Sequence, residues 1–378
     1  MLLGIHLTLL IGPTVPLPAP LMVTEALDKV KVTHQEKKRS GFQITLKMGR
    51  SGPTDLLDYP LMNLPLLAVN NRVIIVVTMS GIPKVLMDGI ITNQEHAPSS
   101  EPGGSTMTVT GEDISLEMDR EEKQVEHPAQ NELIIANKII LSYAQYGLIP
   151  MVIPPLSLDL PLPIERIPVQ KATDLRFLKD LAERHGYVFY ITPGPVPMTN
   201  TAYWGPPIRV GLPQEAITMN MDADTNVEGQ INFQYNSLAA EKIEGQVQDR
   251  QTNQQLPVKA FASLRIPLAA KPDWLLNLSK LRTKKMDFSG LNYMQAFGRA
   301  QAAFDSSTDE TLEGTGQLDT IRYGGLLEPR ALVGVRGAGY SYDGLYYVKK
   351  VTHNIKGGDY KQSFTIGREG LGSLTPIV

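Results

Sequence analysis

Alternating apolar and polar residues along the first third of the chain predict β-strands. In the run from Ile5 to Ile11 every second residue is aliphatic, which is the period of a strand with one buried face. More alternating or β-branched runs follow, and the polar link Ser80-Gly81 between two of them is typical of a hairpin turn. We therefore expect residues 1–115 to form a first β-domain.

The pattern changes to a helical period in the middle of the chain. A helix is expected to begin near Asn131, and a second, compact helix is expected at about 174–185 with Thr173 as its cap. The second helix leads directly into the strand-like run YVFYIT. Residues 116–225 therefore read as a mixed α/β insertion domain.

Strand patterns return after this insertion, so we expect residues 226–378 to form a second β-domain. A helical and loop excursion at about 267–320 should interrupt it. The excursion contains a helix with Tyr293 and Phe297 on one face. Its last part, residues 305–320, is polar and predicts a solvated loop.

The tetrapeptide KVTH occurs twice, at residues 31–34 and 350–353. Each copy ends an alternating segment and is followed by a short polar link and a second alternating run, at 41–49 and 360–368. We interpret the match as two related β-units, one near each end of the chain. The alternative is convergence, because hairpins draw on few residue types.

Composition narrows the functional classes. The chain has 378 residues, a formal net charge of −3 and no cysteine. Disulfide frameworks and thiolate sites are therefore excluded, and no global basic field exists to attract nucleic acid. No apolar run is long enough to predict a membrane-spanning helix. The apolar start of the chain lacks a basic region, so no signal peptide is expected.

Motifs that carry catalysis or bind metals are missing from the sequence. The six histidines are scattered, without metal-ligand spacing. The segment beginning at Asp222 resembles a calcium loop, but Val227 and Phe233 stand where that loop needs Gly and Glu. The adjacent carboxylates Glu121 and Glu122 are best read as a solvated charged face. We predict no catalytic residue, no metal site and no cofactor.

The charged run Glu36, Lys37, Lys38 and Arg39 is the only residue-level candidate for an interface. It lies between two alternating runs, so it is either a solvated hairpin tip or a docking contact.

Three stretches of the sequence carry a resemblance to a known family, and residues 28–150 carry a weaker, collinear one. The run ATDLRFLKDLAERHGYVFYITPG at 172–194 resembles a signature of the phage late-control gene D family. The segments at 316–339 and 342–376 resemble its C-terminal signature, and 342–376 is the more specific of the two. Members of this family are hub proteins of contractile phage tails and related injection machines. The chain is also similar in organisation to the base of type VI secretion VgrG proteins.

This resemblance implies a fold and partners. It implies two tube-protein-like β-barrel domains with a mixed α+β middle domain, assembled as a homotrimer that offers six similar barrels. Such a trimer would meet the hexameric inner-tube protein on one side and a trimeric spike on the other. VgrG chains continue into a spike, whereas this sequence ends at Val378, so the spike is expected to be a separate protein. Other baseplate proteins are further candidate partners.

The resemblance favours a non-enzymatic structural hub, assembled in the bacterial cytoplasm as part of a virion or injection particle. Two other classes stay open. One is a tail-associated peptidoglycan hydrolase that uses acidic residues of 116–225, and the other is a surface-binding module. The sequence does not distinguish a phage from an extracellular or membrane-anchored injection system.

Overall fold

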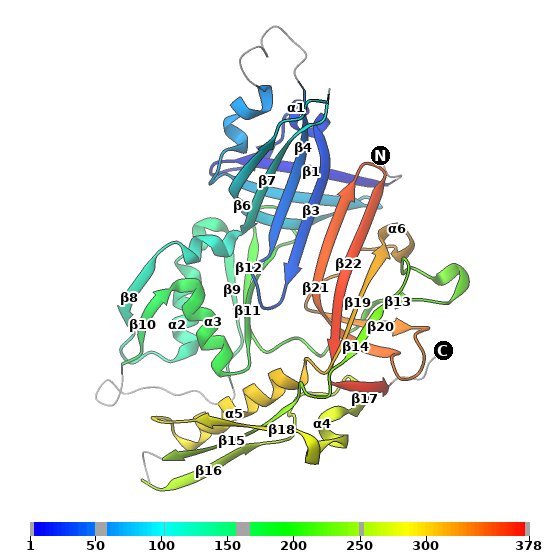
Figure 1. Ribbon diagram of the computed structural model, residues 1–378. Helices are drawn as coiled ribbons and strands as arrows, with labels where there is room; N and C mark the ends of the chain where they lie inside the picture. Colours follow the sequence, from blue (N-terminus) through cyan, green and yellow to red (C-terminus); the bar gives the residue numbers. More distant parts are fainter. Residues whose placement is uncertain (1–3, 50–58, 102, 156–166, 249–252, 375–378) are drawn as a thin grey trace.

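The computed structural model describes residues 4–49, 59–101, 103–155, 167–248 and 253–374, and its main feature is one long sheet (Figure 1). In spatial order the sheet contains β14 (Asn232–Tyr235), β19 (Leu312–Asp319), β22 (Asp359–Arg368), β21 (Gly344–Lys356), β3 (Leu27–Gln35), β4 (Gly41–Met48), β7 (Ser105–Asp113), β6 (Ile82–Ala97), β5 (Arg72–Met79), β1 (Ile5–Gly12) and β2 (Leu17–Pro18). The strands β20 (Leu332–Arg336) and β13 (Gln214–Thr218) continue from β21. The prediction of a mainly β fold is confirmed.

The two ends of the chain build the sheet by the same connectivity. In the first β-unit, β3 pairs with β4, β4 with β7, β7 with β6, and β6 with β5. In the second β-unit, β14 pairs with β19, β19 with β22, β22 with β21, and β21 with β20. Among these strands, the order along the chain and the order of pairing in the sheet are the same in the two units. The units differ at their first strand, because β1 is antiparallel to β5 whereas β13 is parallel to β20.

This connectivity corrects our match between the two KVTH hairpins. By chain and pairing order, β3 and β4 correspond to β14 and β19, and β21 and β22 correspond to β6 and β7. The hairpins that contain 31–34 and 350–353 therefore occupy different places in their units. The match was wrong because the residue types of a half-buried hairpin recur wherever one face is buried.

The two KVTH copies are instead direct neighbours, where β3 pairs antiparallel with β21 (Figure 1). Thr33 lies opposite Thr352, and their hydroxyl oxygens are 3.2 Å apart. On the opposite face of the sheet, the rings of His34 and His353 meet edge to face with centroids 6.0 Å apart. We call this β3–β21 pairing the seam, because it turns two β-units into one continuous sheet.

The period-two pattern places each unit's apolar residues on one face. Val30 and Val32 of β3 pack with Phe42 and Ile44 of β4 in the first core. Tyr360 of β22 also belongs to this core, so the core crosses the seam. A second core lies within the second β-unit and includes these residues: Ile217, Leu312, Leu318, Val333, Val335, Tyr346, Val348, Val351, Phe364 and Ile366.

A separate α/β unit, the middle unit, lies beside the first β-unit at the left of Figure 1. It contains β8 (Glu122–Glu126), α2 (Glu132–Leu141), β9 (Leu148–Val152), β10 (Val169–Thr173), α3 (Asp174–Arg184), β11 (Val188–Pro193) and β12 (Asn200–Gly205). Both predicted helices are confirmed. The Asn131 side chain caps α2, and the Thr173 hydroxyl caps α3. The buried Trp204 donates its indole N–H to the Leu178 carbonyl at 3.1 Å.

A third unit, the lower unit, lies at the bottom of Figure 1. It contains β15 (Glu241–Gln248), β16 (Gln255–Ala260), β18 (Arg282–Asp287) and the helix α5 (Tyr293–Thr308), which share one apolar core. The nearby short elements are β17 (Ala269–Pro272), α4 (Asp273–Leu276) and β23 (Gly370–Ser373). The remaining short helices are α1 (Leu21–Glu25), α6 (Thr320–Tyr323), η2 (Pro60–Asn63), η3 (Pro65–Leu67), η4 (Ile114–Asp119), η5 (Ala144–Tyr146), η6 (Asp222–Asp224) and η7 (Leu278–Lys280).

The lower unit corrects our excursion at 267–320. It begins with β15 and ends with α5, and the predicted solvated loop at 305–320 is wrong, because this segment holds the end of α5 and all of β19. Buried polar residues misled the prediction. Asp305 is buried but accepts a hydrogen bond from Ser263 at 2.7 Å. The domain boundaries after residues 115 and 225 stay predictions.

Burial keeps the two seam histidines neutral. Burial lowers the pKa of His353 to about 3. Burial, then the nearby His353 and Arg330, lower the pKa of His34 well below its usual value. The other groups that face the pair are Lys84 and Tyr360, whose hydroxyl lies 3.0 Å from His353 Nδ1. Because an unfolded histidine binds a proton near pH 6.5 and the folded pair does not, unfolding takes up protons.

We therefore predict that acid destabilises the fold from about pH 6.5 downward. His353 should account for a loss of about 2 kcal/mol at pH 5, and His34 should add a loss in the same direction. The variant His353→Asn should flatten this part of the pH profile, measured by urea denaturation from pH 7.5 to pH 5. His6→Asn is the matched control, because His6 is exposed. Equal acid sensitivity in the wild type and His353→Asn would contradict the prediction.

Candidate functional site

One face of the long sheet is polar from β14 to β6. Residues on this face are opposite the apolar cores and belong to eight neighbouring strands. We define the polar face by these residues: Asn232, Gln234, Glu313, Thr315, Gln317, Asp319, Lys361, Ser363, Thr365, Lys350, Thr352, Asn354, Lys356, Lys29, Lys31, Thr33, Gln35, Gln43, Thr45, Lys47, Thr106, Thr108, Thr110, Glu112, Asn93 and Glu95. On β6 the register also places Ala97 and Ile90 on this side, so the face is polar up to the last strand and suits water there.

The polar face ends at two strands with free backbone edges. β14 pairs with β19 on one side and with no other strand of the described chain. At the opposite end, β6 pairs with β5 only up to Ile90, so its residues 92–97 pair with β7 alone within the described ranges. Unpaired strand edges favour pairing with another chain. The two edges are therefore candidate assembly surfaces.

The candidate run 36–39 forms the turn between β3 and β4, and it contacts other parts of the chain. Lys37 forms an ion pair with Glu310, just after α5. Arg39 Nη1 lies 3.0 Å from a Glu112 oxygen and 3.3 Å from an Asp119 oxygen. The side chain of Lys38 is exposed and that of Glu36 is half-buried. Lys37 and Arg39 of the turn thus form ion pairs within the same chain. The role of the turn in contacts between chains stays a prediction.

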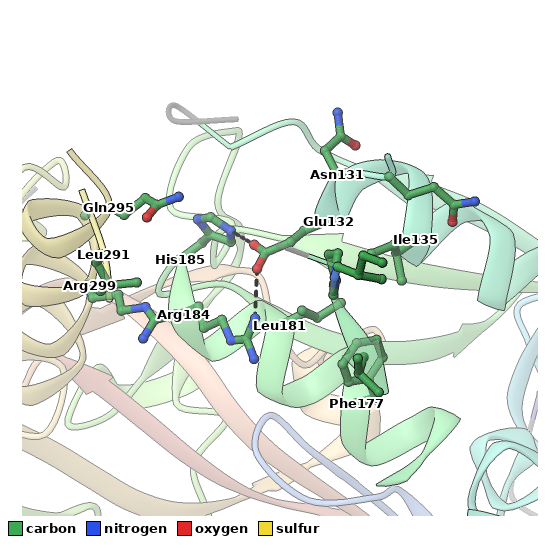
Figure 2. Close-up of a pocket in the computed structure, with 15 residues that line it drawn as sticks. Asn131, Glu132, Ile135, Phe177, Leu181, Arg184, His185, Leu291, Gln295 and Arg299 are labelled. Carbon is green, nitrogen blue, oxygen red and sulfur yellow. Dashed lines mark hydrogen bonds and ion pairs between the residues drawn. The ribbon is translucent and has the colours of Figure 1, made fainter. Parts of the chain in front are cut away.

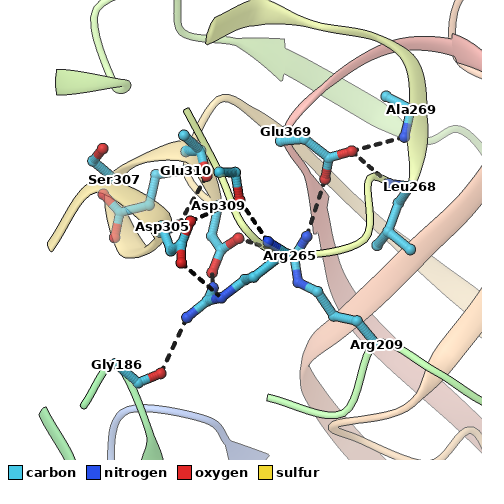
Figure 3. A network of polar contacts seen from close by, with 12 residues as sticks. Gly186, Arg209, Arg265, Leu268, Ala269, Asp305, Ser307, Asp309, Glu310 and Glu369 are labelled. Atoms are coloured by element: carbon cyan, nitrogen blue, oxygen red, sulfur yellow. Dashed lines mark hydrogen bonds and ion pairs between the residues drawn. The ribbon is translucent and has the colours of Figure 1, made fainter. Parts of the chain in front are cut away.

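A buried charge network lies near this turn and joins three units (Figure 3). Arg209, in the link from the middle unit to the second β-unit, binds Asp309 and also Glu369, with Nη1 3.1 Å from the Glu369 carboxylate. Arg265 of the lower unit also binds Asp309 and donates to the Gly186 carbonyl at 3.1 Å. We call these groups the charge lock.

Each charged side chain of the lock has an oppositely charged partner: Arg209, Arg265, Asp309 and Glu369. Glu369 also accepts backbone N–H bonds from Leu268 at 2.5 Å and Ala269 at 2.8 Å. Burial alone would lower the pKa of Arg209, but Asp309 and Glu369 outweigh it and raise that pKa. Burial raises the pKa of Asp305. Removing Arg209 would leave Glu369 buried without an ion-pair partner in the lock, and removing Glu369 would leave Arg209 with Asp309 alone, so either loss is expected to cost several kcal/mol.

A cavity of about 270 Å³ lies between α2, α3 and α5 (Figure 2). Glu132 points into it and binds His185 and Arg184, with Arg184 Nη1 3.0 Å from a Glu132 oxygen. Burial would raise the pKa of Glu132, but these two partners outweigh it and lower it. A general acid must hold its proton near pH 7, so an ionised, saturated carboxylate does not suit that role.

The hydrolase hypothesis finds no carboxylate pair in this cavity. Glu132 is the only carboxylate among the described residues that line it, whereas most glycosidases need two. Glu121 and Glu122 have exposed side chains at the start of β8. No group of three or more His, Cys, Asp or Glu residues in the described ranges is arranged to hold a metal ion. No helix of the described chain is long and apolar enough to cross a membrane.

Sequence reasoning missed the charge lock. Its four central residues, Arg209, Arg265, Asp309 and Glu369, are far apart in the sequence and belong to no motif. One weak signal existed, because Arg368 and Glu369 stand between two glycines near the end of a strand pattern, where a buried charge needs a partner.

Comparison with known proteins shows which solved structures share this fold. No family model and no curated protein matches the sequence. Among solved structures, a tail protein from Neisseria meningitidis matches with TM-score 0.67 and 13% identity over 98% of both chains. A prophage tail protein from Shewanella oneidensis matches with TM-score 0.64 and 12% identity over 97% of this chain and 98% of the other.

The same fold occurs in type VI secretion. An Escherichia coli component of that system matches with TM-score 0.53 and 13% identity over 90% of this chain and 73% of the other. A chain of a Francisella PdpA–VgrG complex matches with TM-score 0.53 and 10% identity over 98% of this chain and 59% of the other. The chain therefore has the fold shared by phage tail proteins and VgrG-type components.

The charge lock yields a prediction for stability. Glu369→Gln removes one buried charge and should destabilise the fold by about 3 kcal/mol, because Arg209 keeps its charge with one carboxylate fewer. Glu244→Gln is the matched control, since the Glu244–Lys259 pair is exposed and its charged atoms are 3.9 Å apart. That control should cost less than about 1 kcal/mol. Urea denaturation at pH 7 measures both, and equal losses would contradict a special role for the lock.

Proposed function

We propose that this protein is a structural hub of a contractile phage tail or phage-like injection system. In this proposal three copies form a ring that joins a hexameric inner tube to a trimeric spike. The fold shared with tail proteins and VgrG-type components supports the general role. The hub acts through shape and complementary surfaces, without catalysis.

The observation that carries the proposal is the seam between two β-units of equal connectivity. One chain presents two similar units side by side in one continuous sheet. Three such chains around an axis would present six similar units, which is the number that a hexameric ring needs. Closed symmetric rings are the usual form of homo-oligomers.

The free edges supply a way to close the ring. Pairing β14 of one copy with residues 92–97 of β6 in the next would extend the sheet from chain to chain, and closure would remove both unpaired edges. The polar face of Lys, Thr, Gln and Asn would then line the central channel, because both apolar cores lie on the other side of the sheet.

The other parts of the proposal concern partners and location. The inner-tube protein, a separate spike protein and other baseplate proteins are the proposed partners. Assembly would occur in the bacterial cytoplasm, as part of a virion or injection particle. The middle and lower units stand outside the long sheet and are available for those contacts (Figure 1).

We predict a trimer that depends on the β14 edge. Purified protein should sediment at three chain masses. The double variant Asn232→Lys and Gln234→Lys places two charges on the free edge, which opposes strand pairing between chains. It should weaken the trimer at least about tenfold in dissociation constant, or about 1.4 kcal/mol.

The control is Gln43→Lys, a change on the same polar face but in a central strand. It should leave the trimer intact. A wild-type chain that stays monomeric at high concentration would overturn the ring, and equal effects of the edge and central variants would overturn the role of the edge.

A further inference from the structure

A groove of about 330 Å³ lies where both β-units and the middle unit meet. Its walls come from the start of β6, the end of β11 and the loop before β20, and His34 and His353 of the seam also line it. Aliphatic and proline residues make up most of the walls: Ile82, Pro83, Val85, Leu86, Pro193, Pro195, Leu326, Leu327 and Pro329. We call it the junction groove.

Arg330, a residue of this groove, is a buried cation that forms no ion pair with a carboxylate of the described ranges. Only 4% of its surface is exposed. Its Nη2 donates to the Gln35 carbonyl at 2.6 Å, and its guanidinium lies 4.0 Å from the centre of the Tyr190 ring. Burial lowers the pKa of Arg330 and outweighs Asp113 and Glu36, which act on its charge without forming an ion pair. Its buried Nε has no hydrogen-bond partner among the described residues. A charge in this state costs stability until an anion compensates it.

Other groups of the groove add to the same positive field. Lys84 lines it and pairs with Glu328, the only carboxylate among the described lining residues. That pair is partly exposed, with 40% and 56% of the two side chains accessible. After burial and His353, the positive charges of Arg330 and Lys84 also lower the pKa of His34, so a negative charge in the groove would oppose part of that lowering. Among its described lining residues the groove therefore has two cationic side chains, Arg330 and Lys84, and one carboxylate, Glu328.

We propose that the junction groove binds an extended segment of a partner protein in which an acidic side chain is flanked by apolar ones. Arg330 and Lys84 recognise the carboxylate, and the aliphatic and proline walls receive the apolar neighbours. A free inorganic anion would use the charge but not the walls, so the lining favours the peptide. The seam histidines line the groove and so report the bound carboxylate. This inference does not depend on the trimer.

The test uses the full-length protein labelled with carbon-13 in its histidine rings. The two probes are the peptides acetyl-Leu-Asp-Leu-amide and acetyl-Leu-Asn-Leu-amide. At millimolar concentration the Asp peptide should shift the NMR signals of His34 and His353 and raise the apparent pKa of His34 by about 1 unit. The Asn peptide should leave these signals in place. Inorganic phosphate should act more weakly than the Asp peptide. Equal or stronger action of phosphate would show a plain anion site and overturn the peptide assignment.

Substitutions separate recognition of the carboxylate from nonspecific binding of the peptide. Lys84→Met should weaken binding of the Asp peptide, and Glu328→Gln should tighten it, each by up to about fivefold. Arg330→Met should abolish the response, and Lys361→Met on the polar face is the matched control that keeps it. Arg330→Met can fail to fold, so the opposite effects at Lys84 and Glu328 decide the outcome. The proposal is overturned if neither seam histidine responds to the Asp peptide, or if both exposed substitutions act in the same direction.

Discussion

The backbone pairing of β3 with β21 is the interaction on which the rest of this structure depends. Without it, each β-unit would expose one more strand edge and the first core would lose Tyr360. With it, the two units share one sheet whose apolar cores lie on one side and whose polar face lies on the other. Both the candidate assembly edges and the junction groove take their positions from this pairing.

Local features of the fold could be predicted from the sequence because they depend on nearby residues. The caps Asn131 and Thr173 mark the starts of α2 and α3 correctly, and alternation identifies the strands. Which strands become neighbours depends on contacts between distant residues. The KVTH copies show this limit, since their likeness suggested equivalent places and their actual relation is direct pairing. Residues 305–320 show another, because partners elsewhere in the chain allow polar side chains such as Asp305 to be buried.

The charged residues also divide into those that the sequence indicates and those whose role depends on tertiary contacts. The run 36–39 was visible in the sequence as a cluster, yet its contacts with Glu310, Glu112 and Asp119 depend on the tertiary fold. The charge lock and Arg330 left almost no trace in the sequence, because their members are far apart along the chain and belong to no motif. Their importance comes from burial, which makes a lone charge costly and a paired charge specific. Only the folded chain reveals which of its 36 cationic residues are buried.

The connection between the first two strands of the sheet path, which we call the corner, differs greatly in size between the two β-units. Between β3 and β4 it is the short turn that contains Lys37, whereas between β14 and β19 it holds the whole lower unit. The ion pair from Lys37 to Glu310 joins these two corners. In the proposed ring of three chains, small and large corners would alternate, so one surface would look uniform to a sixfold neighbour while the other would offer three projecting platforms.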